Sequence, residues 1–166
     1  TMKSVWILSI LTELQLTYLD MSETVGLGEL DYASSVPSTL RELKLGGCYI
    51  EHIPQSMTRL SELESLDVSS NAIKSLHPSF FTMTHLTELN LLNNSIEQIP
   101  VLFKFMSGLK SLQIDPTVVI PTQLKSLFPD RVLKDRPVKR PLDDRFKVYI
   151  TGDGTRTEIF TSVAKK

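Results

Sequence analysis

The sequence has a single cysteine, Cys48, and lacks any apolar run long enough to cross a membrane. One cysteine cannot form an internal disulfide, so the disulfide scaffolds of small secreted domains are excluded. The longest early apolar run, Val5 to Ile10, is far shorter than the ~20 residues of a transmembrane helix. No signal-peptide cleavage site of small residues accompanies this run. Together these absences predict a cytoplasmic protein.

The sequence also lacks an excess of charge of either sign. It has 18 basic and 19 acidic residues and a formal net charge of −1. No global electrostatic field therefore draws it to nucleic acid or to a membrane. Its histidines, His52, His77 and His85, are too far apart in sequence to match a metal-ligand spacing. We find no catalytic constellation, and we expect no enzyme activity, metal, cofactor, nucleic-acid partner or membrane partner.

What the sequence does have is a repeated apolar skeleton, Leu-x-x-Leu-x-Leu with conservative exchanges. The first leucine of each unit is Leu16, Leu40, Leu63, Leu86 or Leu109. The steps between them are 24, 23, 23 and 23 residues (40−16, 63−40, 86−63, 109−86). A fixed period in this range is typical of a solenoid whose units each contribute one short strand. We therefore expect about five repeats with parallel strands on the concave face.

A second apolar set repeats in phase with the first. Three units contain an isoleucine followed ten residues later by another apolar residue, as in Ile50 and Leu60, Ile73 and Met83, and Ile96 and Met106. These residues predict a return path that packs against the strands. One position after each strand is mostly small or polar and is expected to bond neighbouring turns through its side chain. The residues at this position are Thr24, Cys48, Asn71, Asn94 and Thr117.

These motifs resemble the leucine-rich repeat superfamily. The segments Leu-Glu-Ser-Leu-Asp-Val-Ser-Ser-Asn at 63–71 and Leu-Thr-Glu-Leu-Asn-Leu-Leu-Asn-Asn at 86–94 carry the resemblance, which covers roughly residues 16 to 129. The Ile-Pro variants are similar to the 23-residue class common in intracellular signalling scaffolds. The resemblance implies an α/β solenoid with a protein-binding concave face. We divide the chain into a cap or partial repeat (1–15), repeats (16–130), a charged linker (131–145) and a C-terminal extension (146–166).

The strand residues that do not point inward are predicted to form the binding surface. They are mixed, polar and modestly acidic, which suits a protein partner with both charges better than a nucleic acid. Aromatic, apolar and basic side chains are the expected anchors, since such residues dominate interface energetics. The candidate partner-binding residues are Tyr18, Arg41, Lys44, Asp67, Glu88, Asn90 and Leu92. An ordinary solvated strand face is the alternative for each of them taken singly.

The C-terminal extension allows two interpretations. It can form a β-hairpin with arms at 146–151 and 157–163, joined around Gly152-Asp153-Gly154. Alternatively, a strand leading into Gly152 resembles the Roco proteins, in which leucine-rich repeats precede a Ras-like GTPase domain. That resemblance implies a regulatory segment of a larger signalling protein. Here, however, Glu158 replaces the phosphate-binding lysine and Ile159 the metal-binding hydroxyl, so we expect no nucleotide binding.

Overall fold

The computed structural model describes residues 15–27, 31–124, 145–151 and 156–162. The cap or partial repeat predicted at 1–15 and the linker predicted at 131–145 lie almost wholly outside these residues. Within them, no helix is long and apolar enough to cross a membrane.

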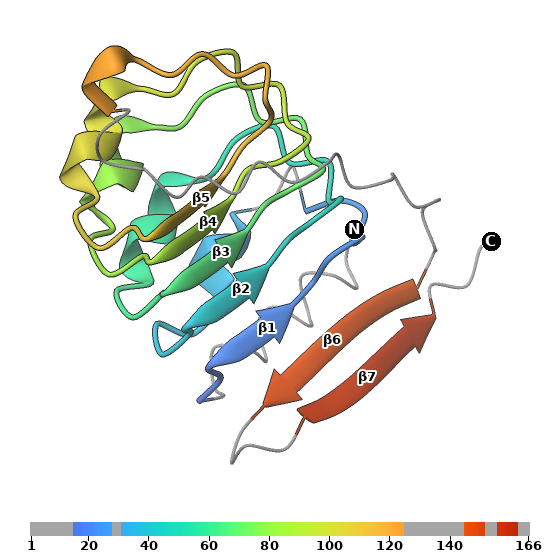
Figure 1. Cartoon of the computed structure of the whole chain (residues 1–166). Coiled ribbons are helices and arrows are strands. Elements are labelled where there is room, and N and C mark those ends of the chain that lie inside the picture. The colour runs from blue at the N-terminus through green and yellow to red at the C-terminus, as the bar shows by residue number, and fades with distance from the viewer. Residues whose placement is uncertain (1–14, 28–30, 125–144, 152–155, 163–166) are drawn as a thin grey trace.

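Five short strands form one parallel sheet in sequence order, as the repeat predicts (Figure 1). Each strand has three residues, with a buried leucine between two residues that face outward. A strand of three residues is long enough to form a sheet here, because it pairs on one or both sides with the same segment of a neighbouring repeat. The strands are β1 (Tyr18–Asp20), β2 (Glu42–Lys44), β3 (Ser65–Asp67), β4 (Glu88–Asn90) and β5 (Ser111–Gln113).

The return paths contain short 3₁₀ turns, which form a second layer behind the sheet (Figure 1). The middle turns begin after Pro54, His77 or Pro100 in extended conformation, and each buries at least one large apolar side chain. The turns are η1 (Tyr32–Ser35), η2 (Gln55–Arg59), η3 (Pro78–Thr82), η4 (Val101–Phe105) and η5 (Thr122–Leu124). All helical segments in the described residues are of this short type.

One continuous core lies between the two layers. It extends from Leu16 in the first repeat to Leu124 after the fifth. Both apolar sets expected from the sequence are in it, including Leu66 and Leu89 from the strands and Ile73 and Met83 from the return path. Because each repeat is only two thin layers, its apolar face is covered chiefly by the adjacent repeats.

The chain turns out of the sheet in the same way after four of the strands. The residue seven positions after the first leucine of the repeat has a positive φ, between 56° and 71°, in each case. These residues are Glu23, Gly47, Ser70 and Asn93. Only one of the four is glycine, so packing and turn hydrogen bonds hold the other three in a conformation that side chains disfavour.

A separate two-stranded sheet follows the repeats. Its strands, β6 (Arg145–Thr151) and β7 (Arg156–Ser162), pair antiparallel, and β6 lies beside β1 (Figure 1). A phosphate-binding loop would lead from a strand into a helix, whereas here a strand leads into a strand. This arrangement favours the hairpin interpretation of the extension over the Roco-like one.

Candidate functional site

The outward-facing residues of the five strands form one surface, which we call the strand face. The register aligns them in rows, so that Glu42, Ser65 and Glu88 are neighbours, as are Asp67 and Asn90. A further row precedes the strands and holds Thr17, Arg41, Glu64, Thr87 and Lys110. Six of the seven predicted partner-binding residues lie in these rows. The structure thus brings residues from four repeats onto one side of the sheet.

Lys44 is half-buried among neighbours on β1 and β2. Its Nζ lies 3.0 Å from Oε1 of Glu42 and 5.2 Å from the centre of the Tyr18 ring. The Tyr18 hydroxyl donates to Oδ2 of Asp20 at 3.4 Å. Burial acts to lower the pKa of Lys44, but the hydrogen bond and charge of Glu42, with the Tyr18 hydroxyl, outweigh it and raise the pKa. Lys44 is therefore already paired within the chain.

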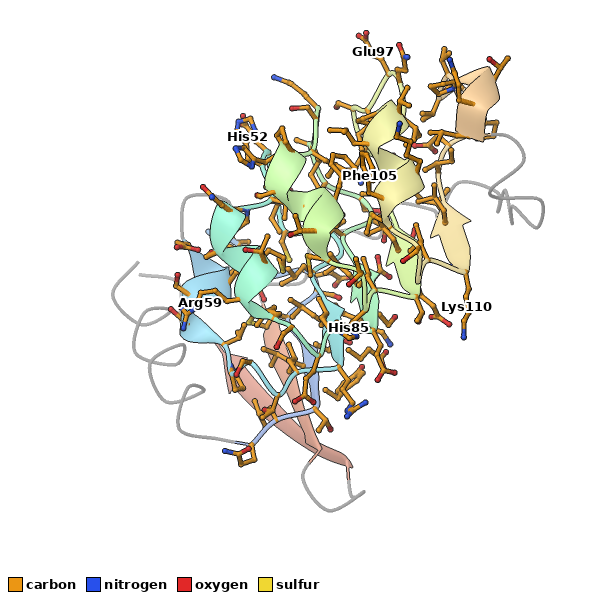
Figure 2. All side chains as sticks on the ribbon, turned by 90° about the vertical axis from the view of Figure 1, so that its left-hand side faces the viewer. His52, Arg59, His85, Glu97, Phe105 and Lys110 are labelled. Carbon is orange, nitrogen blue, oxygen red and sulfur yellow. The ribbon has the colours of Figure 1, made fainter. Side chains whose placement is uncertain are left out.

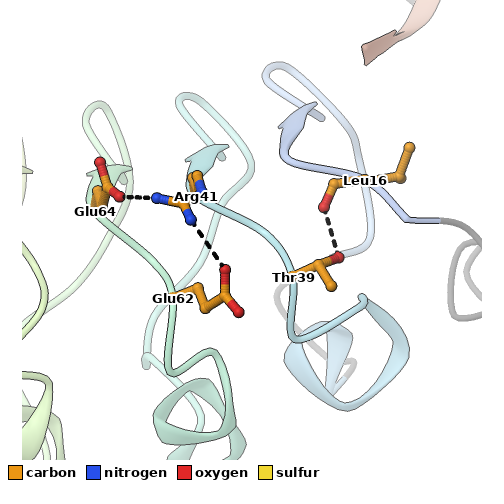
Figure 3. A network of polar contacts seen from close by, with 5 residues as sticks. All are labelled: Leu16, Thr39, Arg41, Glu62 and Glu64. Atoms are coloured by element: carbon orange, nitrogen blue, oxygen red, sulfur yellow. Dashed lines mark hydrogen bonds and ion pairs between the residues drawn. The ribbon is translucent and has the colours of Figure 1, made fainter. Parts of the chain in front are cut away.

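Arg41 is also engaged within the chain, although its side chain is more than half exposed. Its guanidinium bonds Oε1 of Glu64 and lies 3.3 Å from Oε2 of Glu62 (Figure 3). These pairs connect the second repeat to the third. In the same view the Thr39 hydroxyl donates to the Leu16 carbonyl at 2.9 Å, which connects the first repeat to the second.

The last residue of three strands also stabilises the turn that follows. Asp20, Asp67 and Asn90 each accept a hydrogen bond from the main-chain N–H two residues later, at 2.9 to 3.1 Å. Such bonds are typical of Asp and Asn at the start of turns. Our sequence reasoning missed this role, although the Asp or Asn at the end of these three strand motifs was the available signal.

The structure corrects the prediction for Leu92. The sequence interpretation placed it on the exposed surface, but it is only 3% exposed. The alternation of inward and outward residues holds only within the strand, and β4 ends at Asn90. By Leu92 the chain has begun to turn toward Asn93, whose φ is positive, so counting in steps of two no longer gives the correct side. Leu92 therefore cannot serve as an exposed anchor.

The predicted ladder between turns is present in the central repeats. Oδ1 of Asn71 accepts from the N–H groups of Cys48 and Ile50, both at 2.9 Å. Its amide group donates to three main-chain carbonyls, one of them that of Leu45 in the preceding repeat. Asn94 donates to three carbonyls in the same way and accepts from one N–H. These amides satisfy polar groups where the main chain leaves the sheet.

Cys48 occupies the ladder position of the second repeat, as predicted. It is completely buried, and its Sγ donates to the Met21 carbonyl at 3.1 Å. Burial raises the pKa of its thiol from 9.0 to about 12. Since the thiolate is the reactive form, Cys48 is a structural residue rather than a nucleophile.

We expect Cys48 in the folded protein to resist a thiol-specific reagent near neutral pH and to react fully in urea. The thiol has a pKa of 9.0 in the unfolded chain and about 12 in the folded protein. The stability that the buried, protonated thiol contributes is therefore present below pH 9 and is lost as the pH rises from 9 to about 12. Labelling followed by mass spectrometry, with and without urea, checks the first point. Equal labelling rates in the two conditions would show that the thiol is accessible.

The turn of the fifth repeat differs from the earlier ones. Asn93 N donates to Oδ2 of Asp115 at 2.8 Å, whereas Ser70 N, one repeat earlier, donates to the main-chain carbonyl of Leu92. Pro116 occupies the position that has positive φ in the other repeats, and its ring forbids that conformation. Thr117 is consequently exposed, and its predicted ladder role is wrong.

Asp115 is 7% exposed, and its carboxylate takes the place of the main-chain carbonyl that accepts the corresponding bond one repeat earlier. We expect Asp115→Ala to lower the free energy of unfolding by about 1–3 kcal/mol, because the Asn93 N–H loses its acceptor. Asp115→Asn should cost less, because its amide oxygen can accept the same bond. Urea unfolding of the two variants tests this order. Equal losses would mean that the hydrogen bond does not stabilise the turn.

A shallow groove lies on the return path, away from the strands. It has a volume of about 320 Å³, and His52 and His77 are among its lining residues. Nδ1 of His77 accepts from the main-chain N–H of Ser79 at 3.2 Å, so this imidazole caps η3. In the described part of the chain, no group of three or more histidine, cysteine or acidic side chains is placed to hold a metal ion.

Comparisons with known proteins agree with this geometry. The family model for the leucine rich repeat matches residues 61–117. Volume-regulated anion channel subunit LRRC8D of Rattus norvegicus is 38% identical over 73 residues, which are 43% of this chain and 8% of that protein. Subunit LRRC8A of Homo sapiens is 34% identical over 91 residues, 52% of this chain and 11% of that protein. The chain thus matches only a small part of the length of these relatives.

Among solved structures, a leucine-rich repeat protein of Leptospira interrogans has a TM-score of 0.52 and 26% identity. The alignment covers 61% of this chain and 26% of that one. With the five-strand sheet and the ladder, these matches show that the chain contains leucine-rich repeats. The fold is an α/β solenoid of a kind that typically serves as a protein-interaction scaffold.

Proposed function

We propose that this chain is an intracellular protein-interaction module, active in signalling, that binds a protein partner on the strand face. One observation carries the proposal. The parallel register places outward-facing side chains from five consecutive repeats on one surface, where an extended or folded partner can contact them together. Repeat solenoids use their concave face in this way.

The intracellular setting is supported by the single buried thiol and the absence of a disulfide framework in the sequence. The half-buried ring of Tyr18 and the paired cations Arg41 and Lys44 supply a partly apolar region with pre-paired charges at one end of the face. Pre-paired side chains lose little conformational freedom when a partner docks.

Site-specific photo-crosslinking tests the proposal. A photoreactive amino acid is placed at Ser65 or Ser111 on the strand face, and at the exposed Ser75 on the return path as the control. After irradiation in a cell extract, we expect the same protein to be joined to the chain from both strand positions and not from Ser75. Crosslinks to that protein from Ser75 alone would place the interface on the opposite layer.

A further inference from the structure

The strand face carries more acidic than basic side chains. Its three rows contain five carboxylates, on Asp20, Glu42, Glu64, Asp67 and Glu88. They contain three cations, on Arg41, Lys44 and Lys110. The sequence as a whole is nearly neutral, so this imbalance is a property of the surface rather than of the composition.

Ion pairs within the chain leave the unpaired charge of the face mostly acidic. Arg41 is held by Glu62 and Glu64, and Lys44 is held by Glu42. Three carboxylates (5 − 2) and one cation (3 − 2) of the rows therefore have no ion pair in the described residues. A partner's carboxylate would meet Arg41 or Lys44 with its charge already partly neutralised by a pair within the chain. Lys110, which has no ion pair in the described residues, precedes the edge strand β5 and lies at one end of the face.

Asp67 and Glu88 are the carboxylates left at the centre, on the adjacent strands β3 and β4, and neither has an ion-pair partner in the described residues. Asp67 uses one oxygen for the Ser69 N–H, and Glu88 accepts from the Ser65 hydroxyl at 3.3 Å with one oxygen. The second oxygen of each makes no hydrogen bond to a described residue. Strand spacing and rise put their Cα atoms about 8 Å apart on the same side of the sheet.

A carboxylate pair at this separation suits a long cationic side chain. A guanidinium or ammonium group placed between the two can bond one oxygen of each, and such charge-assisted hydrogen bonds are the stronger kind. The surrounding residues on the same rows, Ser65, Asn90 and Ser111, are small or polar and leave room for an extended segment to lie across the strands.

We propose, building on the strand-face function above, that the partner is a protein with a segment rich in Lys or Arg, which docks across β3 and β4 with a cationic side chain between Asp67 and Glu88. The sequence interpretation had favoured a partner of mixed charge. The ion pairs at Arg41 and Lys44 change that expectation, because they match both central cations with carboxylates and leave Asp67 and Glu88 as the unpaired charges at the centre.

A phage-displayed library of random peptides, selected on the immobilised full chain, tests this proposal. Selected peptides are then synthesised, and their affinities are measured by fluorescence anisotropy. The test variant combines Asp67→Asn with Glu88→Gln, which removes two charges while Asn can still accept the bond from Ser69. The matched control combines Glu51→Gln with Glu97→Gln, two exposed residues outside the strand rows. Figure 2 shows Glu97 far from Lys110, which belongs to one of these rows.

We expect the selected peptides to be richer in Lys and Arg than the library. The test variant should bind them about tenfold more weakly, and the control should change affinity by less than about twofold. Selection of peptides without basic enrichment, or equal affinities for the two double variants, would overturn the proposal.

Ser65→Trp fills the middle of the strand face without adding charge. This variant separates the proposal of a basic partner from the broader proposal that the strand face binds a protein. If non-basic peptides bind and Ser65→Trp blocks them, the strand face is the binding surface and only the charge inference fails. If the selected peptides bind Ser65→Trp as well as the original chain, they dock elsewhere and both proposals fail.

Discussion

Replacing Phe103 by alanine is expected to lower the free energy of unfolding by about 3–5 kcal/mol, among the largest losses for a single truncation in this chain. Phe103 is 1% exposed and lies in the middle of η4. Its ring meets that of Phe81 edge-on, with the centroids 5.1 Å apart. The truncation would open a cavity between the third and fourth repeats, where only side chains of adjacent repeats can fill it.

Phe105 in the same turn provides the matched control. It is 55% exposed, and Nζ of Lys104 lies 5.0 Å from its ring centre. Phe105→Ala should change stability by less than about 1 kcal/mol, as expected at an exposed site. Urea unfolding followed by circular dichroism measures both variants. Similar losses for the two would mean that η4 is rotated relative to the structure described above.

Leu89→Ala is the second large effect, with an expected loss of about 2–5 kcal/mol. Leu89 is the inward residue of β4 and is 1% exposed. It pairs in register with Leu66 and Leu112, so the cavity would lie on the central column of the core. Glu88→Ala, one residue earlier and exposed, is the control and should be nearly neutral. A loss below ~0.5 kcal/mol for Leu89→Ala would contradict the inward assignment.

The strand register could be predicted from the sequence because the repeat supplies it five times. A one-residue slip in any repeat would turn its central leucine, such as Leu66 or Leu89, to the solvent side. The parallel sheet, both apolar sets and the ladder at Cys48, Asn71 and Asn94 followed from this periodicity alone. Position in the repeat was therefore as informative as residue type.

Two of the errors fall where the period stops determining the main chain. Leu92 lies beyond the three-residue strand, and Thr117 lies beyond a proline that prevents the shared turn. The ion pairs of Arg41 and Lys44 were not foreseen either. The register puts Arg41 beside Glu64, and Glu42 lies on the same strand as Lys44, but which carboxylate each cation meets depends on side-chain conformation. These pairs decide the charge of the candidate site, which composition could not give.

The central claim is that a protein partner binds the strand face. The most direct measurement is the affinity of the partner identified by crosslinking, determined by titration calorimetry for the original chain, Ser65→Trp and Ser75→Trp. We predict a loss of about tenfold or more for Ser65→Trp, an unchanged affinity for Ser75→Trp, and nearly equal melting temperatures for all three. Equal affinities for the three proteins would contradict the claim.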